Sequence, residues 1–180
     1  MTARPATLDH FEIALDVAIR VCTERDLTPL EWFGLFTEHR NIIRAAFEAQ
    51  KQGRGLMLVA DLNGYPIGQA WIDFTKESAV LWAIRVLPPL QGAGIGTRLI
   101  VAAEEVARRR GFAHTRIGVE KDNTDARRLY ERLGYRLTGS LQEECRYTTP
   151  EGVPMCVLVD QWVLDKPLNK PPTGRRGRIA

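Results

Sequence analysis

Apolar residues recur at helical spacing in two stretches of the chain, residues 37–52 and 94–110, and a glycine follows each stretch. Residues three and four apart share one face of a helix, and glycine commonly ends a helix. Each stretch therefore predicts an amphipathic helix that packs on a core. A third helix is expected to begin near Thr23, whose hydroxyl can cap it. It would carry Leu30, Trp32 and Phe33.

Apolar runs between turn residues predict the strands. Asn63-Gly64 is typical of a tight hairpin, and a second hairpin is expected to turn at residues 150–152. The predicted strands span residues 17–22, 56–61, 66–74, 79–86, 144–149 and 155–164, with a short strand before Asn123. Strands and helices follow one another in a mixed order, which favours an α/β (α+β) fold with helices packed on a sheet.

The composition favours one domain without a membrane segment. A chain of 180 residues suffices for one well-packed core. It has no run of about 18 apolar residues and no signal-peptide pattern at its start, so we expect a cytoplasmic protein that does not enter a membrane. Cys22, Cys145 and Cys156 are widely spaced and in no metal-ligand pattern, which predicts reduced thiols and no metal site.

The ends of the chain differ from its middle. We expect residues 1–16 to form an N-terminal extension and residues 17–165 to form the domain. Residues 166–180 are rich in proline, glycine and basic side chains, which predicts a disordered tail. The net charge of +3 is mild and lies largely in this tail, so no nucleic-acid partner is expected.

A glycine-rich turn joins the strand ending at Val86 to the helix that begins near Gly94. Such a turn lets the backbone approach a ligand, and the helix directs its unpaired N–H groups toward it, which suits a phosphate. The Gly-Lys-Ser/Thr of a P-loop and the Gly-x-Gly-x-x-Gly of a dinucleotide site are both absent. The turn instead reads Gln91-x-x-Gly94-x-Gly96, preceded by Val86-x-Pro88.

A second motif follows the next predicted strand. Asn123 begins a helical pattern with alanine at the third and tyrosine at the seventh following position, closed by Leu-Gly-Tyr. The matching residues are Asn123, Ala126, Tyr130, Leu133, Gly134 and Tyr135. Together the two motifs resemble those of the GCN5-related N-acetyltransferase (GNAT) superfamily, over roughly residues 18–164.

The resemblance implies a fold, a donor and binding residues. The fold would be a mixed, largely antiparallel sheet flanked by helices and splayed at an acyl-CoA site, and the donor acetyl-CoA. Asn123 would bind the pantetheine arm beside the strand around Ile84 and Val86, although Asn123 can equally serve as a helix cap. The turn would hold the pyrophosphate through Gln91, Gly92, Ala93, Gly94, Gly96 and Thr97.

The resemblance also indicates catalytic candidates. Tyr130 would protonate the leaving thiolate, although a tyrosine at this spacing can also be a core residue. Glu77 is a candidate base by its place before the strand at 79–86, and a solvated turn carboxylate is the alternative. The further carboxylates whose orientation the sequence leaves open are Asp73, Glu120, Glu143 and Glu144.

The sequence thus predicts an N-acetyltransferase that transfers an acetyl group to a primary amine by direct attack. A small-molecule amine is favoured, because Gly118 stands where some N-terminal protein acetyltransferases of the family carry a glutamate. The alternatives are a protein (N-terminal or lysine) acetyltransferase and a non-catalytic acyl-CoA-binding sensor. The oligomeric state is left open, with a homodimer as one option.

Overall fold

The computed structural model describes residues 11–168, which form one seven-stranded sheet with helices on both faces. The strand order is β1-β2-β3-β4-β5-β7-β6, and every neighbouring pair is antiparallel except β4 and β5. The strands are β1 (Ala18–Val21), β2 (Gly55–Leu62), β3 (Tyr65–Asp73), β4 (Ala79–Val86), β5 (His114–Glu120), β6 (Arg136–Thr148) and β7 (Pro154–Pro167). The predicted mixed, largely antiparallel sheet is confirmed.

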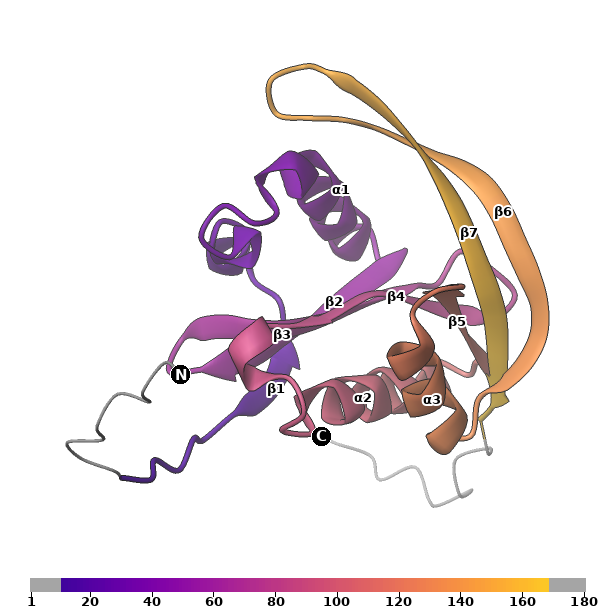
Figure 1. The fold of residues 1–180 in the computed structure, drawn as a ribbon, viewed down its shortest axis with the longest axis horizontal. Helices are drawn as coiled ribbons and strands as arrows, with labels where there is room; N and C mark the ends of the chain where they lie inside the picture. Colours follow the sequence, from indigo (N-terminus) through magenta and orange to yellow (C-terminus); the bar gives the residue numbers. More distant parts are fainter. Residues whose placement is uncertain (1–10, 169–180) are drawn as a thin grey trace, which may run out of the picture.

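The amphipathic helices divide between the two faces of the sheet. Helices α2 (Ile95–Arg109) and α3 (Thr124–Arg132) lie on one face, and α1 (Arg40–Lys51) lies on the other (Figure 1). The larger core packs α2 against the strands, and Leu99 and Ile100 are fully buried in it. A smaller core lies under α1, around Trp71. None of the helices in the described part of the chain is long and apolar enough to cross a membrane.

The prediction of a helix that begins near Thr23 is wrong. The segment forms three short 3₁₀ turns instead, at Glu24–Asp26, Pro29–Glu31 and Thr37–His39. Between the last two, Trp32 and Phe33 adopt positive φ angles of 43° and 57°, which no α-helix allows. The Trp32 side chain is buried, and its Nε1 donates to the Pro66 carbonyl oxygen at 2.8 Å. Tertiary anchoring of this indole thus overrides the local helix signal.

The last hairpin is much longer than predicted. β6 begins at Arg136 and pairs with β7 along its whole length, and the two strands curve away from the sheet toward the α1 side (Figure 1). The first half of β6 was not predicted from the sequence, because its side chains are mostly exposed and carry no apolar alternation. Pairing with β7, rather than burial, makes this segment a strand.

The ends of the described chain bear on the predicted domain limits. β7 continues to Pro167, two residues past the predicted domain end at residue 165. Lys166 is part of this strand, and its Nζ donates to Glu104 Oε2 on α2 at 2.7 Å. Most of the predicted N-terminal extension and tail, residues 1–10 and 169–180, lies outside the described residues.

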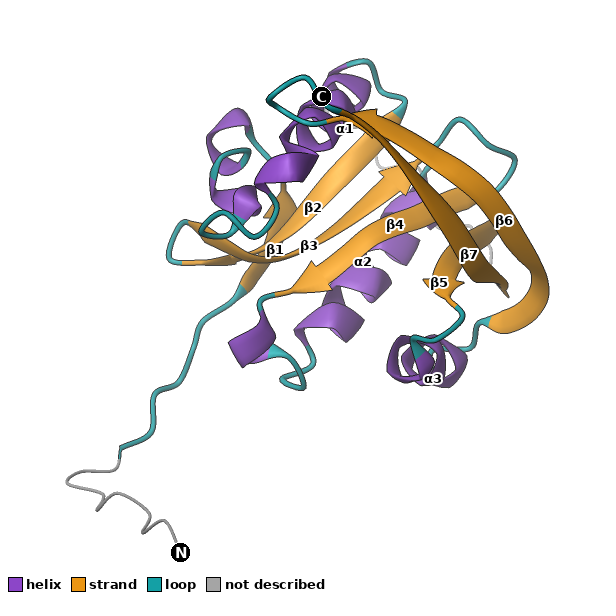
Figure 2. Ribbon diagram, turned by 45° about the horizontal axis from the view of Figure 1, so that its top comes forward, coloured by secondary structure: helices purple, strands orange, loops and turns teal. Residues whose placement is uncertain are grey.

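β4 and β5 are paired at one end and separate toward the other (Figure 2). The parallel pairing covers Ala79–Leu81 against Thr115–Ile117 and then stops. Farther along β4, the register with β3 shifts and Ala83 has a positive φ of 49°, as in a β-bulge. The β5-facing edge of residues 84–86 therefore has no strand partner within residues 11–168. This is the splay that the resemblance implies.

Candidate functional site

A cavity of about 730 Å³ lies where β4 and β5 separate. The end of β4, the glycine-rich turn, the start of α2, one face of α3 and the turn at residues 32–36 enclose it. It collects most of the residues that the two motifs single out. The predicted site residues that line it are Ile84, Val86, Gln91, Gly92, Gly94, Gly96, Thr97, Asn123 and Tyr130. Ala93 and Glu77 are not among its lining residues.

The glycine-rich turn forms an open backbone surface at the start of α2. Gly92 and Gly94 have φ angles of 83° and 80°, and a Cβ at either position would meet no atom within 4 Å. The first hydrogen bond of the helix runs from the Arg98 N–H to the Gly94 carbonyl oxygen at 3.1 Å. The N–H groups of residues 95–97 therefore precede the helical ladder, and no acidic side chain lies in the first turn. This geometry suits an anion.

Gln91 has a positioning role in this turn. Its Nε2 donates to the Val86 carbonyl oxygen at 3.0 Å and so ties the turn to the last residue of β4. The chain between them makes a 3₁₀ turn at Pro88–Leu90. The glutamine of the motif thus fixes the distance between the strand end and the helix start.

Tyr130 extends from α3 into the cavity. It is 7% exposed, and burial raises the pKa of its phenol to about 12. The hydroxyl makes no hydrogen bond within the described residues, and the ring packs edge-on against Tyr135. Tyr130 is therefore a buried aromatic residue that also lines the cavity and keeps its hydroxyl protonated. The core role and the proton-donor role that the sequence left open are compatible.

Asn123 caps α3. Its Oδ1 accepts a hydrogen bond from the Ala126 N–H at 3.1 Å, so the capping role that the sequence left open is present. The side-chain amide can still donate its two hydrogens, and the residue lines the cavity. The cap and a ligand contact are therefore compatible.

Arg85 and Phe36 are lining residues that the sequence analysis missed. The Arg85 guanidinium carbon lies 4.2 Å from the centre of the Phe36 ring, and burial lowers the pKa of this arginine. Phe36 stacks on His39, and the His39 ring in turn meets Tyr147 edge-on. Burial, and then the charge of Arg85, lower the pKa of His39. The sequence did contain a signal for Arg85, because a charged residue between the apolar Ile84 and Val86 is unusual in a buried strand.

The structure does not bring Glu77 to this cavity. Glu77 is exposed in the turn between β3 and β4, before β4 begins, whereas the cavity lies at the other end of that strand. The other carboxylates also lie elsewhere. Glu120 is exposed and accepts a hydrogen bond from Gln161, and Glu143 and Glu144 are exposed on β6.

Gly118 is covered by a side chain from β7. A Cβ at Gly118 would collide with Oε1 of Gln161, because that amide lies over the glycine. The position where some protein acetyltransferases carry a glutamate is thus filled from another strand. Within residues 11–168, no three His, Cys, Asp or Glu side chains lie close enough together to hold a metal ion.

Comparisons with known proteins agree on one family. The sequence model of the protein family described as "Acetyltransferase (GNAT) family" matches residues 23–135. An uncharacterized N-acetyltransferase of Methanocaldococcus jannaschii is 37% identical over 149 residues, which cover 72% of this chain and 65% of that protein's length.

Two solved structures share the fold. A putative acetyltransferase from Salmonella typhimurium with acetyl-CoA has a TM-score of 0.67 at 21% identity, over 89% of this chain and 98% of its own. The ribosomal-protein-S18-alanine N-acetyltransferase of Escherichia coli has a TM-score of 0.64 at 21% identity, over 89% of this chain and 99% of its own.

Proposed function

The chain belongs to the acetyltransferase (GNAT) family, and from this premise we propose that it is an acetyl-CoA-dependent N-acetyltransferase acting on a primary amine. The observation that carries the proposal is the shared cavity. The glycine-rich turn, the unpaired edge of β4 and the Tyr130 side chain all border it. A donor that has a pyrophosphate at one end and a thioester at the other needs these three features together.

The residues of the cavity fit acetyl-CoA. The backbone N–H groups around Gly92, Gly94 and Gly96 would hold the pyrophosphate, with Thr97 beside them. The unpaired edge at Ile84 and Val86 would pair with the amides of the pantetheine arm as an added strand does. The Asn123 amide would donate to the same arm. Ala93 contributes as the link between two glycines.

The acetyl-CoA thioester supplies an activated acetyl group, and the chain supplies the groups around it. The Tyr130 hydroxyl is our candidate for the proton donor to the leaving sulfur. Its raised pKa keeps it protonated at neutral pH, which an acid requires. Glu77 has no part in this mechanism because of its exposed place in the β3–β4 turn.

The acceptor must reach the site as a neutral amine. An alkylamine with a pKa near that of lysine lies about 3.4 units above pH 7, so losing its proton costs about 4.6 kcal/mol. Among the lining residues Asp125 is the only carboxylate, and it lies in the first turn of α3. We therefore expect the rate to rise with pH as the neutral fraction of the amine grows.

A small-molecule acceptor is supported over a protein acceptor by Gly118. Gly118 offers no carboxylate that could serve as a base, and the Gln161 amide lies over this position instead. A protein acceptor is the second candidate, because the similar structure from Escherichia coli is named as a ribosomal-protein-S18-alanine N-acetyltransferase. At 21% identity this similarity supports the fold alone. A sensor that binds acyl-CoA without turnover is the third candidate.

The test is thiol release from acetyl-CoA by the purified full chain with a panel of acceptors. The panel contains small primary amines, a peptide with a free N-terminal alanine and a peptide with an internal lysine. Turnover with a small amine supports the proposal. Turnover with the peptides alone favours a protein acetyltransferase. Tight acetyl-CoA binding without release of thiol to any acceptor favours the sensor.

A further inference from the structure

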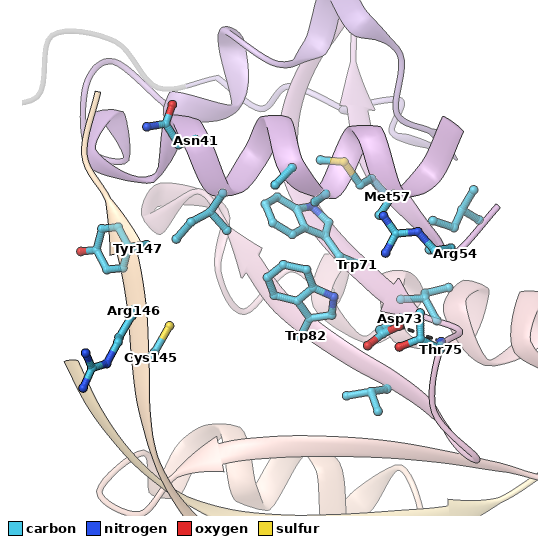
Figure 3. Close-up of a pocket in the computed structure, with 18 of the residues that line it drawn as sticks. Asn41, Arg54, Met57, Trp71, Asp73, Thr75, Trp82, Cys145, Arg146 and Tyr147 are labelled. Atoms are coloured by element: carbon cyan, nitrogen blue, oxygen red, sulfur yellow. Dashed lines mark hydrogen bonds between the residues drawn. The ribbon is translucent and has the colours of Figure 1, made fainter. Parts of the chain in front are cut away.

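A second cavity lies on the opposite face of the sheet from α2. Its volume is about 720 Å³, and it is enclosed by α1, by β2, β3 and β4, and by the part of β6 that curves over them. Figure 3 shows Trp71 and Trp82 at its centre, with Cys145, Arg146 and Tyr147 of β6 on one side and Asp73 and Arg54 on the other. The donor site uses none of these residues.

The two cavities border successive parts of the same strand, β4, and share no lining residue. Val80 and Trp82 line the second cavity, whereas Ile84 and Val86 line the donor cavity. The left-handed Ala83 stands between the two sets. At a rise of about 3.3 Å per residue, Trp82 and Ile84 are only about 7 Å apart along the strand. A molecule beside Trp82 can therefore extend one end toward the segment where we place the thioester.

The walls of the second cavity are mainly apolar and aromatic. On the α1 side the helix presents small residues, Ala45, Ala46 and Ala49, which leave room above the sheet. On the sheet side, the rings of Trp71 and Trp82 lie 4.7 Å apart at an interplanar angle of 89°. Trp71 is 2% exposed, whereas Trp82 keeps 38% of its surface exposed. A flat apolar group fits between such rings and a helix of alanines.

The charged groups of this cavity argue against a polyamine. Its lining has one carboxylate, Asp73, whereas Arg54 and Arg146 are exposed and their guanidinium groups donate to Gln52 and to Glu144. A ligand with several positive charges would find a single opposite charge and a mainly apolar wall there. A ligand with one amine and an apolar body is better suited, because only its amine end needs a polar environment.

We propose that this cavity is the acceptor subsite and that the acceptor is an arylalkylamine, a primary amine on a short alkyl chain that carries one aromatic ring. The inference rests on the proposed function. The ring lies against Trp82 and the alanines of α1, and the amine end points past Ala83. The neutral amine nitrogen attacks the thioester carbonyl carbon, so a C–N bond forms and the C–S bond breaks. The sulfur leaves with the electron pair and takes one proton, while the nitrogen loses one proton, which gives an N-acetylated amine and free CoA.

The experiment uses 2-phenylethylamine as the probe and spermidine as the competing class, with the full chain and saturating acetyl-CoA. Ala45→Phe fills the cavity from an exposed helix position, so it leaves the fold intact. Val101→Phe adds bulk to an exposed position of α2 that lines neither cavity, and it is the matched control. Trp82→Ala removes the ring surface and is a second, independent variant.

We expect kcat/KM for 2-phenylethylamine to exceed that for spermidine by about tenfold or more. Ala45→Phe and Trp82→Ala lower it by a similar factor and leave the Kd of acetyl-CoA unchanged, whereas Val101→Phe changes neither. Better turnover of spermidine, or full activity of both cavity variants, overturns the inference and leaves the proposed function standing.

If no amine is acetylated, the proposed function fails. Binding of 2-phenylethylamine to the chain then tests the proposed subsite separately. Calorimetric binding of 2-phenylethylamine to the unmodified chain that is lost in Ala45→Phe and kept in Val101→Phe supports the subsite. Absence of binding to the unmodified chain overturns it.

Discussion

At the residue scale, Tyr130 differs from its neighbour Tyr135 in what its hydroxyl meets. The Tyr135 hydroxyl lies 3.1 Å from Thr115 Oγ1 in the core, and Tyr135 does not line the donor cavity. Tyr130 lines the donor cavity, and its hydroxyl makes no hydrogen bond among the described residues. The two tyrosines are both buried and their rings are in contact, so Tyr135 serves as a matched control for substitutions of Tyr130.

We predict that Tyr130→Phe lowers kcat by about 10²-fold or more, because a positioned acid is typically worth about 10²- to 10⁴-fold. The Kd of acetyl-CoA, measured by titration, should change little, because the ring remains. Tyr135→Phe should keep kcat near its original value while losing some stability. An unchanged kcat in Tyr130→Phe would sink the acid assignment.

At the scale of elements, helix α2 carries a left-handed glycine at each end. Gly94 precedes its first residue with a φ of 80°, and Gly111 follows its end with a φ of 90°. A side chain at either position would find open space but would adopt a strained backbone, at about 1–2 kcal/mol. The two positions share the same strain, and only Gly94 borders the donor cavity.

We therefore predict that Gly94→Val and Gly111→Val lose similar stability, while only Gly94→Val loses acetyl-CoA binding. The valine side chain at residue 94 would occupy the space that the phosphates need in front of the helix. Thermal unfolding and calorimetric titration measure the two effects separately. Equal loss of binding in both variants would indicate strain alone, and intact binding in Gly94→Val would contradict the phosphate-turn hypothesis.

The elements also differ in how well the sequence predicts them. The helix α2 and the Asn63-Gly64 hairpin follow from local patterns, and both are confirmed. The predicted helix beginning near Thr23 was wrong, because the buried contacts of Trp32 impose a turn on a sequence with helix-start residues. The first half of β6 was missed because its strand character comes from its partner, β7.

At the scale of the whole molecule, an ion pair links the segment before α1 to the edge of the sheet. Asp26 is 1% exposed. It accepts hydrogen bonds from Arg20 on β1 at 2.6 and 2.8 Å and from Thr23, and Arg20 also donates to Asp61 on β2. Burial alone would raise the pKa of Asp26, but the hydrogen bonds from Arg20 and Thr23 lower it to about 2.

This lowered pKa makes the stability of the domain depend on pH. The folded chain holds the Asp26 carboxylate more strongly than the unfolded chain does, so its contribution is complete above about pH 4 and is lost as the pH falls toward about 2. A shift of this size corresponds to about 2 kcal/mol. We predict that Asp26→Asn lowers the free energy of unfolding near neutral pH and flattens its acid dependence.

Chemical denaturation at several pH values measures this effect. Glu48→Gln is the control, because Glu48 is 56% exposed in its ion pair with Lys51, and such pairs contribute little. It should leave the acid dependence unchanged. An Asp26→Asn variant with the full acid dependence of the original chain would show that other carboxylates cause it.

The sequence by itself determined the two motifs to which we assign the donor site, from Val86 through the glycine-rich turn and from Asn123 to Tyr130. These motifs are local: a turn that needs left-handed glycines, a helix start and a helix cap are each specified by residues within a few positions of one another. Their meeting in one cavity follows from the fold that the family resemblance implied.

Only the tertiary structure decided what lies around them. Gln161 covers Gly118, Arg85 stacks on Phe36, and the second cavity forms between α1, strands β2, β3 and β4, and β6. Each of these contacts joins residues far apart in the chain, whose meeting depends on strand register and helix placement. Local patterns carry no record of such contacts, so only the folded chain shows the cavity that we propose for the acceptor.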